Sequence, residues 1–513
     1  MSFKHMFALA CAAALVAAVG CFSGQAAETP SSAVSERPAA ATTLGGEATR
    51  AQQGAAPQLG GPVASTGGTT APVTPVSIDP EAWKSEIIAR VSIPLGGGEP
   101  DGRSEGCSIS ADGRYVVFSS QADNLVPGDT NLVTRPGPDT GDPNWTEPPI
   151  TYNATDVFVF DRQTGSLERV SVAGDGTQGD DSSGGVGIST DGRYVVFVSE
   201  ADNLVAGDTN KASDAFVHDR QTGATERVGL AGDGSQGNGA SYPRGISPDG
   251  RYVLFGSDAS NLVPGDTNGV QDVFLRDRQA GTTERVNLGS GGEQTDQDSY
   301  GCAMTPDARF VVFDSRANNL VPGDTNKASD IFVRDRLKGI TERVSVSKSG
   351  AQGNQSSYGG SISADGRYVC FDSDASNLVP GDTSSLRRDV FVYDGQTRTI
   401  KRVSVSPAGK EGANSSGSSC LSADGRYVVF RSYASNLVSG DTNRKDDIFV
   451  RDLKTGTTRR VSLSAQGEQQ DTEGIGGTIS ADGRWVVFVS RAGNLVPGDT
   501  NEMEDIFVTK ADR

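Results

Sequence analysis

One repeat constrains this chain more than any other feature of its sequence. The motif Asp-Gly-Arg, once Asp-Ala-Arg, recurs at Asp112, Asp191, Asp249, Asp307, Asp365, Asp424 and Asp482. Successive copies are 79, 58, 58, 58, 59 and 58 residues apart. A fixed period of this length is typical of propellers and solenoids, in which each unit buries its apolar face against its neighbours. We therefore expect one large domain made of seven copies of one unit.

Each repeat contains four segments with the character of β-strands. They are a short run ending Ser-Ile-Ser, then Arg-Tyr-Val-Val-Phe-Ser, Asp-Val-Phe-Val-Arg-Asp and Thr-Glu-Arg-Val-Ser-Val. The composition, with 65 Gly, 23 Pro and 6% aromatic residues, favours short strands and tight turns over packed helices. Fourteen of the 19 phenylalanines occupy two recurrent positions, one in the second segment and one in the third, and we expect them to form the core between repeats.

The two ends of the repeat array indicate a closed ring. Residues 87–93, Ile-Ile-Ala-Arg-Val-Ser-Ile, match the fourth segment of the later repeats, whereas the chain stops after the third segment of its last repeat. The strand missing at the end is thus present at the beginning. This offset predicts an all-β fold, a seven-bladed β-propeller of four-stranded antiparallel blades whose ring is closed by the N-terminal strand completing the last blade.

A family resemblance supports this architecture. The segment Ser-Ala-Asp-Gly-Arg-Tyr-Val-Val-Phe at 422–430, followed by Asp-Ile-Phe-Val-Arg-Asp at 447–452, resembles the WD40-like (PD40) repeat of the TolB-type propellers of bacterial envelopes. The resemblance covers residues 84–513 in seven copies. It implies an envelope protein that binds another protein or a glycan.

The N-terminal segment predicts export. Lys4 precedes an apolar run from Met6 to Val19, too short for a spanning helix but typical of a signal peptide over residues 1–26. Small residues before Cys21 resemble a bacterial lipobox, which would make Cys21 the lipidated first residue of the mature chain, and cleavage near Ala26 is the alternative. Residues 27–83 are rich in Ala, Thr, Gly and Pro, and we expect a disordered tether there. The predicted location is the periplasm or the cell surface, with or without a lipid anchor.

Charge and histidine content narrow the function. Lys and Arg number 46 against 65 Asp and Glu, a net charge of −19, so we expect no nucleic-acid partner and membrane contact only through the anchor. The chain has two histidines, His5 in the signal segment and His218. A catalytic Ser-His-Asp site would therefore have to use His218. We expect a monomeric, non-catalytic binding propeller. The alternatives are an extracellular polysaccharide-active enzyme that uses loop carboxylates and a purely structural surface protein.

Departures from the repeat suggest where a ligand binds. The long loops lie between the second and third segments and between successive repeats, and alternating strand direction places both on one face. On that face the first repeat carries an insertion at 132–155, with five prolines and Trp145. Tyr242, Tyr300 and Tyr358 occupy the same position in three successive repeats, seven residues before the Asp anchor. We predict that Trp145 and these tyrosines bind a protein or glycan, with packing over the channel as the alternative.

A recurrent Asp-Thr-Asn loop suggests a cation. Its oxygens alternate along the chain as Ca²⁺ ligands do, at Asp208, Asn210 and Asp214, at Asp266, Asn268 and Asp272, at Asp324, Asn326 and Asp330, at Asp441, Asn443 and Asp447, and at Asp499, Asn501 and Asp505. Turn capping by Asp and Asn explains the same residues without metal, and both interpretations stay open. No other cofactor is expected.

Four cysteines lie in the first two segments of their repeats, at Cys107, Cys302, Cys370 and Cys420. Their regular positions favour small buried thiols, and a disulfide between Cys370 and Cys420 is the alternative.

Overall fold

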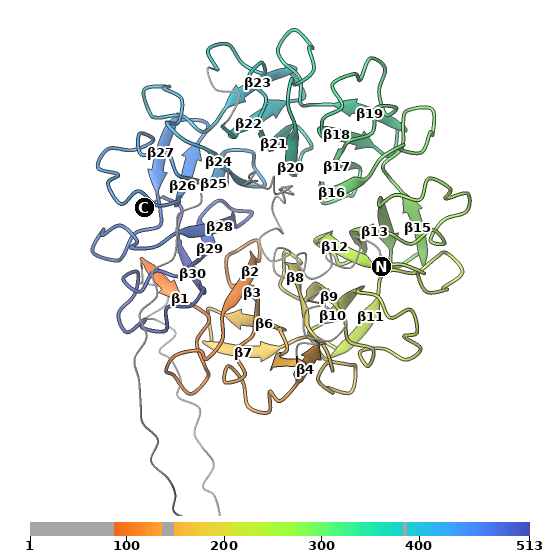
Figure 1. The fold of residues 1–513 in the computed structure, drawn as a ribbon, viewed down its shortest axis with the longest axis vertical. Helices are drawn as coiled ribbons and strands as arrows, with labels where there is room; N and C mark the ends of the chain where they lie inside the picture. Colours follow the sequence, from red (N-terminus) through yellow and green to blue (C-terminus); the bar gives the residue numbers. More distant parts are fainter. Residues whose placement is uncertain (1–86, 136–147, 383–386, 513) are drawn as a thin grey trace, which may run out of the picture. The chain divides into compact units, whose positions relative to one another are not determined.

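The computed structural model describes residues 87–135, 148–382 and 387–512. The predicted signal peptide 1–26, the lipidation site Cys21, the tether 27–83 and Trp145 lie outside these residues. Within them, seven four-stranded antiparallel sheets surround a central channel (Figure 1). The prediction of an all-β, seven-bladed propeller is confirmed.

Each blade has four strand positions, which we name A to D from the channel outward (Figure 1). Position A is occupied by β2 (Ser104–Ile109), β8 (Ser183–Ile188), β12 (Ser241–Ile246), β16 (Ser299–Met304), β20 (Ser357–Ile362), β24 (Ser416–Leu421) and β28 (Gly474–Ile479). Position B is occupied by β3 (Tyr115–Ser120), β9 (Tyr194–Ser199), β13 (Tyr252–Ser257), β17 (Phe310–Ser315), β21 (Tyr368–Ser373), β25 (Tyr427–Ser432) and β29 (Trp485–Ser490). Position C is occupied by β6 (Asp156–Asp161), β10 (Asp214–Asp219), β14 (Asp272–Asp277), β18 (Asp330–Asp335), β22 (Asp389–Asp394), β26 (Asp447–Asp452) and β30 (Asp505–Lys510).

Position D is occupied by β7 (Ser166–Arg169), β11 (Ala224–Arg227), β15 (Thr282–Arg285), β19 (Ile340–Arg343), β23 (Thr399–Arg402) and β27 (Thr457–Arg460) in blades one to six. In the seventh blade β1 (Ile88–Arg90) takes this position. It pairs antiparallel with β30, with Ile88 opposite Thr509 and Arg90 opposite Phe507. The N-terminal strand therefore closes the ring, as the offset of the repeats predicts.

The predicted inter-blade core is also confirmed. In every blade the phenylalanine of strand B stacks on that of strand C, for example Phe255 on Phe274, with ring centroids 5.6 Å apart. Both rings are completely buried and pack against valines of the preceding blade, including Val196 and Val217. Burying such a side chain contributes roughly 1.5–3 kcal/mol. Blades therefore hold one another through alternating layers of Phe and Val.

The fourth strand is shorter than its sequence suggests. In the third blade we expected strand pairing from Thr283 to Leu288, but the strand ends at Arg285. The next residue, Val286, still bonds Val273 through its amide, and then the Asn287 side chain accepts the Val273 amide at 3.0 Å and donates to Asp272 at 2.6 Å. A side chain thus replaces the backbone partner, and the chain turns away early.

The short A–B turns depend on glycine. At Gly250, φ is +71°, and a Cβ atom there would lie 2.3 Å from the ring of Tyr194 in the preceding blade. The Asp249 side chain accepts bonds from the Ser247 hydroxyl and the Arg251 amide. The recurrent Asp-Gly-Arg motif is therefore a capped turn on which the neighbouring blade packs.

Candidate functional site: the channel mouth on the long-loop face

The A strands line the channel and give it two different ends. At the short-turn end, a cavity of about 230 Å³ is lined by the last residue of every A strand, namely Ile109, Ile188, Ile246, Met304, Ile362, Leu421 and Ile479. At the long-loop end, the same strands begin with a buried serine or Gly474, and the residues that follow are Glu105, Gly184, Tyr242, Tyr300, Tyr358, Gly417 and Ile475. The channel thus leads from a polar mouth to a ring of aliphatic side chains.

Every A strand contains an irregularity near its middle. In all seven blades the register between strands A and B shifts at this point. In β12, Pro243 pairs with Phe255 and Gly245 with Leu254, so Arg244 is the extra residue. In β16 the extra residue is Cys302. Bulges redirect side chains and are frequent beside binding sites. Arg244 is the one charged residue at these seven irregularities of the described chain.

The three predicted tyrosines lie at the long-loop end of neighbouring blades. Tyr300 is 40% exposed, and burial of its remaining surface, with nearby carboxylates, raises its pKa to about 12. Tyr242 and Tyr358 are half-buried. The guanidinium of Arg388 covers the Tyr358 ring, 4.3 Å from its centroid, and pairs with Asp374 at 3.0 Å. The structure therefore places the tyrosines in one arc but covers the face of one of them.

Two buried aspartates belong to this arc and were missed by our sequence analysis. Asp314 and Asp372 lie in strands B directly opposite Tyr300 and Tyr358, in a position that is Ser119, Val198, Gly256, Arg431 or Val489 in the other blades. A charge within the otherwise apolar second segment is the signal that could have revealed them.

Burial governs the ionisation of both aspartates. Asp314 accepts bonds from the Cys302 thiol at 3.4 Å and the Ser329 hydroxyl at 3.2 Å. Asp372 accepts the Ser418 amide and the Ser419 hydroxyl, each at 2.7 Å. Desolvation raises the pKa of each to about 6, although these hydrogen bonds and the nearby Arg244, Arg316 and Arg388 oppose the rise. Both carboxyls thus titrate near neutral pH.

The insertion in the first blade forms a hairpin as far as it is described. Its strands β4 (Leu132–Arg135) and β5 (Ile150–Asn153) pair antiparallel. Arg135 binds Asp181 at 2.9 Å and also pairs with Glu200, so the hairpin is attached to the second blade. Leu132 and Ile150 are 60% and 54% exposed. These apolar side chains give the long-loop face a second feature that a partner could cover.

The Asp-Thr-Asn loops hold an arginine in every blade. The arginine that ends strand D binds two aspartates, one from the B–C loop and one that begins strand C. In the third blade, Arg285 lies 3.1 Å from Asp266 and 2.8 Å from Asp272, and the amide of Asn268 also binds Asp272. We call this arrangement the Asp–Arg–Asp clamp. The guanidinium supplies the positive charge that these carboxylates need, which gives the motif a structural account; calcium binding stays a prediction.

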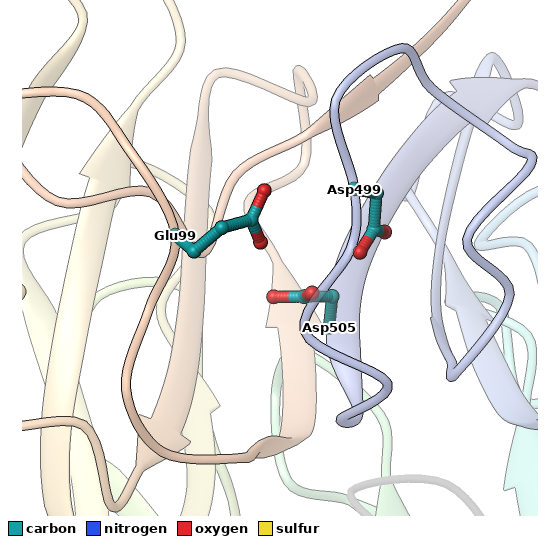
Figure 2. Close-up of side chains that lie close together, drawn as sticks. All are labelled: Glu99, Asp499 and Asp505. Atoms are coloured by element: carbon teal, nitrogen blue, oxygen red, sulfur yellow. The ribbon is translucent and has the colours of Figure 1, made fainter.

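Two clamps contain a third carboxylate. Glu99 joins Asp499 and Asp505 beside the ring closure (Figure 2), and Glu411 joins Asp382 and Asp389 in the fifth blade. Arg90 lies 2.8 Å from Glu99, and Arg402 lies 3.1 Å from Glu411. Other blades have glutamine at this position, as at Gln236 and Gln294. These two clamps carry the most negative charge for a single guanidinium.

Other candidate groups are structural. The four described cysteines, Cys107 among them, are free thiols, and burial raises the pKa of Cys107 to about 12. Cys107 and Cys370 are buried as expected, whereas Cys302 and Cys420 are half-buried, and Cys370 and Cys420 form no disulfide. His218 is buried in β10, where its Nδ1 lies 2.9 Å from the Thr225 hydroxyl, and burial lowers its pKa. No helix among the described residues has the length and hydropathy to cross a bilayer.

Comparison with known proteins gives structural likenesses only. No family model and no curated protein matches the chain. It is similar to the structure of a putative TolB from Agrobacterium tumefaciens, with 17% identity over 67% of this chain and 94% of that one and a TM-score of 0.37. It is also similar to an oligogalacturonate lyase from Vibrio parahaemolyticus, with 13% identity over 85% of this chain and 95% of that one and a TM-score of 0.47. A third similar structure is the β-propeller domain of the Trilobed protease from Pyrococcus furiosus, with 12% identity over 76% of this chain and 90% of that one and a TM-score of 0.45.

Proposed function

We propose that this chain is a non-catalytic binding propeller of the bacterial envelope, related to TolB-type repeat proteins, that recognises a protein or glycan on its long-loop face. Residues that hold the fold repeat from blade to blade, whereas Arg244, Tyr300, Asp314, Asp372 and Arg388 break the repeat and gather at one side of the channel mouth. This loss of symmetry on neighbouring blades is the observation that carries the proposal, because recognition of an asymmetric ligand requires it.

The proposed location follows from the N-terminal sequence. A signal peptide at 1–26 would export the chain, and a lipid at Cys21 would hold it at a membrane through the tether 27–83. The propeller would then act as a monomer in the periplasm or at the cell surface. Metabolic labelling with a fatty acid, compared between the wild type and Cys21→Ser, tests the anchor.

Capture of ligands by the purified full chain tests the binding role. We expect specific retention of an envelope protein or an arrayed glycan by the wild type. Retention should fall at least tenfold in a variant with Tyr242, Tyr300 and Tyr358 all changed to Ala, since aromatic residues dominate binding energy at such sites. Leu337→Ala, an 80% exposed position on a C–D turn of the opposite face, is the matched control. Equal retention by all three proteins would move the site away from the channel mouth.

A second variant tests the insertion. Residues 132–155 are replaced with Lys-Ala-Ser, the segment that the second blade has at 211–213. The first blade then has a B–C loop of the same length as the second, and the chain stays continuous. If the hairpin contributes to recognition, this variant loses the ligand while its thermal unfolding is unchanged. Retained capture would limit the site to the channel mouth.

The raised pKa values of Asp314 and Asp372, both about 6, favour one alternative, an enzyme that acts on extracellular polysaccharide. A carboxyl with a pKa near 6 keeps a protonated fraction in mildly acidic to neutral solution and is able to donate a proton to a leaving group. Release of reducing ends from an envelope polysaccharide, abolished in Asp314→Asn or Asp372→Asn, would establish this alternative over the binding role.

A further inference from the structure

Arg244 differs from the arginines of the Asp–Arg–Asp clamps. In the clamps, each guanidinium contacts at least two carboxylates, as Arg285 does with Asp266 and Asp272. No carboxylate of the described residues lies within 4.0 Å of the Arg244 guanidinium, and its buried Nε has no hydrogen-bond partner. Burial lowers the pKa of Arg244, which expresses the cost of placing a charge there. A half-buried cation without a carboxylate partner is stabilised when a ligand supplies the counter-charge.

Arg244 belongs to an A strand, the strand position next to the channel. It is the extra residue of the β12 bulge, only half-buried, and its Cγ lies 3.4 Å from where a Cβ on Gly301 would be. Glycine at 301 therefore leaves room for the arginine between the A strands of the third and fourth blades. The charges that act on it are those of Asp314, Cys302, Tyr242 and Tyr300. Asp314 is already bonded to Cys302 and Ser329.

Two chemically different surroundings meet at Arg244. Tyr242 lies two residues before it, toward the polar mouth, and Ile246 lies two residues after it, in the aliphatic ring. With a rise of about 3.3 Å per residue, the backbone of Ile246 lies roughly 7 Å along the strand from that of Arg244. Met304 and Ile362 continue the ring in the next two blades. A ligand held here must combine an anionic group with an adjacent aliphatic one.

Charge and polarity narrow the ligand further. The chain carries a net charge of −19, and Asp258, Asp298 and Asp314 all lie near Tyr300 at this mouth. A polyanion would be repelled, whereas a single carboxylate needs only the single arginine. A uronate presents hydroxyl groups on every side of its ring and has no aliphatic group to place against Ile246, Met304 and Ile362. The end of a peptide chain with an apolar last residue meets both requirements.

We propose that Arg244 binds the C-terminal carboxylate of a partner protein, with the partner's last, aliphatic side chain entering the ring of Ile246, Met304 and Ile362. The chain end would pass the tyrosines at the mouth and form two parallel hydrogen bonds with the guanidinium, a geometry that arginine provides and lysine does not. This inference rests on the proposed binding function and specifies its ligand.

Immobilised peptides with a free C terminus provide the test. The probe is an array of nonapeptides with randomised first eight positions and Leu, Val, Gly or Asp as the last residue, each made as the free acid and as the C-terminal amide, incubated with the purified full chain. We expect free acids ending in Leu or Val to bind about ten- to a hundredfold more tightly than their amides, the effect of losing a charge-assisted hydrogen bond. Peptides ending in Gly or Asp should bind weakly even as free acids.

Variants assign the effect to the residue. Arg244→Gln should bind acid and amide equally, and Arg244→Lys should recover only part of the preference. Equal binding of acids and amides by the wild type overturns the proposal, and this comparison holds even if the variants fail to fold. Capture of an envelope partner that persists in Arg244→Gln overturns it while leaving the proposed function intact. Binding of a glucuronate oligomer in place of the peptides overturns it in favour of a glycan.

Discussion

Asp314 and Asp372 show how single residues adapt a repeated scaffold. Each replaces a neutral or basic residue of the repeat and lies buried opposite a tyrosine, with a pKa of about 6. In the unfolded chain the pKa of an aspartate is close to 3.9. Between these values the folded protein holds protons that the unfolded chain has released, so the free energy of unfolding increases as the pH falls from 7 to 4.

We therefore predict that Asp314→Asn removes part of this pH dependence. In the wild type, the protonation of Asp314 should add on the order of 2 kcal/mol to the free energy of unfolding between pH 7 and 4. Asn keeps the acceptor for Ser329 but cannot titrate. Urea unfolding at pH 7, 5.5 and 4 should give a flatter profile for the variant. A parallel profile, shifted by a constant amount, would mean that Asp314 has the same pKa in the folded and the unfolded chain.

Strand D and its clamp are the main stabilising element outside the Phe–Val core. Arg285 is 7% exposed and compensates Asp266 and Asp272, which are also buried. We predict that Arg285→Met lowers the free energy of unfolding by about 3–5 kcal/mol, because both carboxylates then lose their counter-charge. The matched control is Arg251→Met. The ion pair between Arg251 and Asp277 is more exposed, so its loss should lower the free energy of unfolding by less than about 1 kcal/mol. Similar losses in the two variants, measured by urea unfolding, would contradict the special role of the clamp.

The elements also show what a repeated sequence reveals and what it hides. The strand order, the phenylalanine core and the capped Asp-Gly-Arg turn follow from patterns that recur in every copy, so they could be predicted. The clamp could not, because its Arg and Asp come from positions 13 or more residues apart whose contact depends on strand pairing. Arg244 was hidden for another reason: a bulge changes which way a side chain points without changing the sequence period.

At the scale of the whole molecule, closure depends on one short strand. β1 has three residues in strand pairing with β30, and the two strands are joined through more than 400 residues of chain. β15 forms the equivalent position of the third blade, but a tight turn connects it to its partner β14. If β1 detaches, the seventh blade exposes an edge and Asp499 and Asp505 lose Arg90. If β15 detaches, the ring stays closed.

Two proline substitutions at the same position of the repeat distinguish the detachment of β1 from that of β15. Val91 donates its amide to Ile506 at 2.9 Å, and Val286 donates its amide to Val273 at 2.8 Å. Proline removes either hydrogen bond at a similar local cost of about 3 kcal/mol. We predict that Val91→Pro lowers the melting temperature more than Val286→Pro does and makes the N-terminal strand sensitive to limited proteolysis. A strand in a short hairpin re-forms its pairing easily, whereas the closing strand loses more conformational entropy when it pairs again across the ring. Identical melting temperatures and cleavage patterns in the two variants would show that the ring does not depend on its closing strand and that stability is distributed blade by blade, as in an open solenoid.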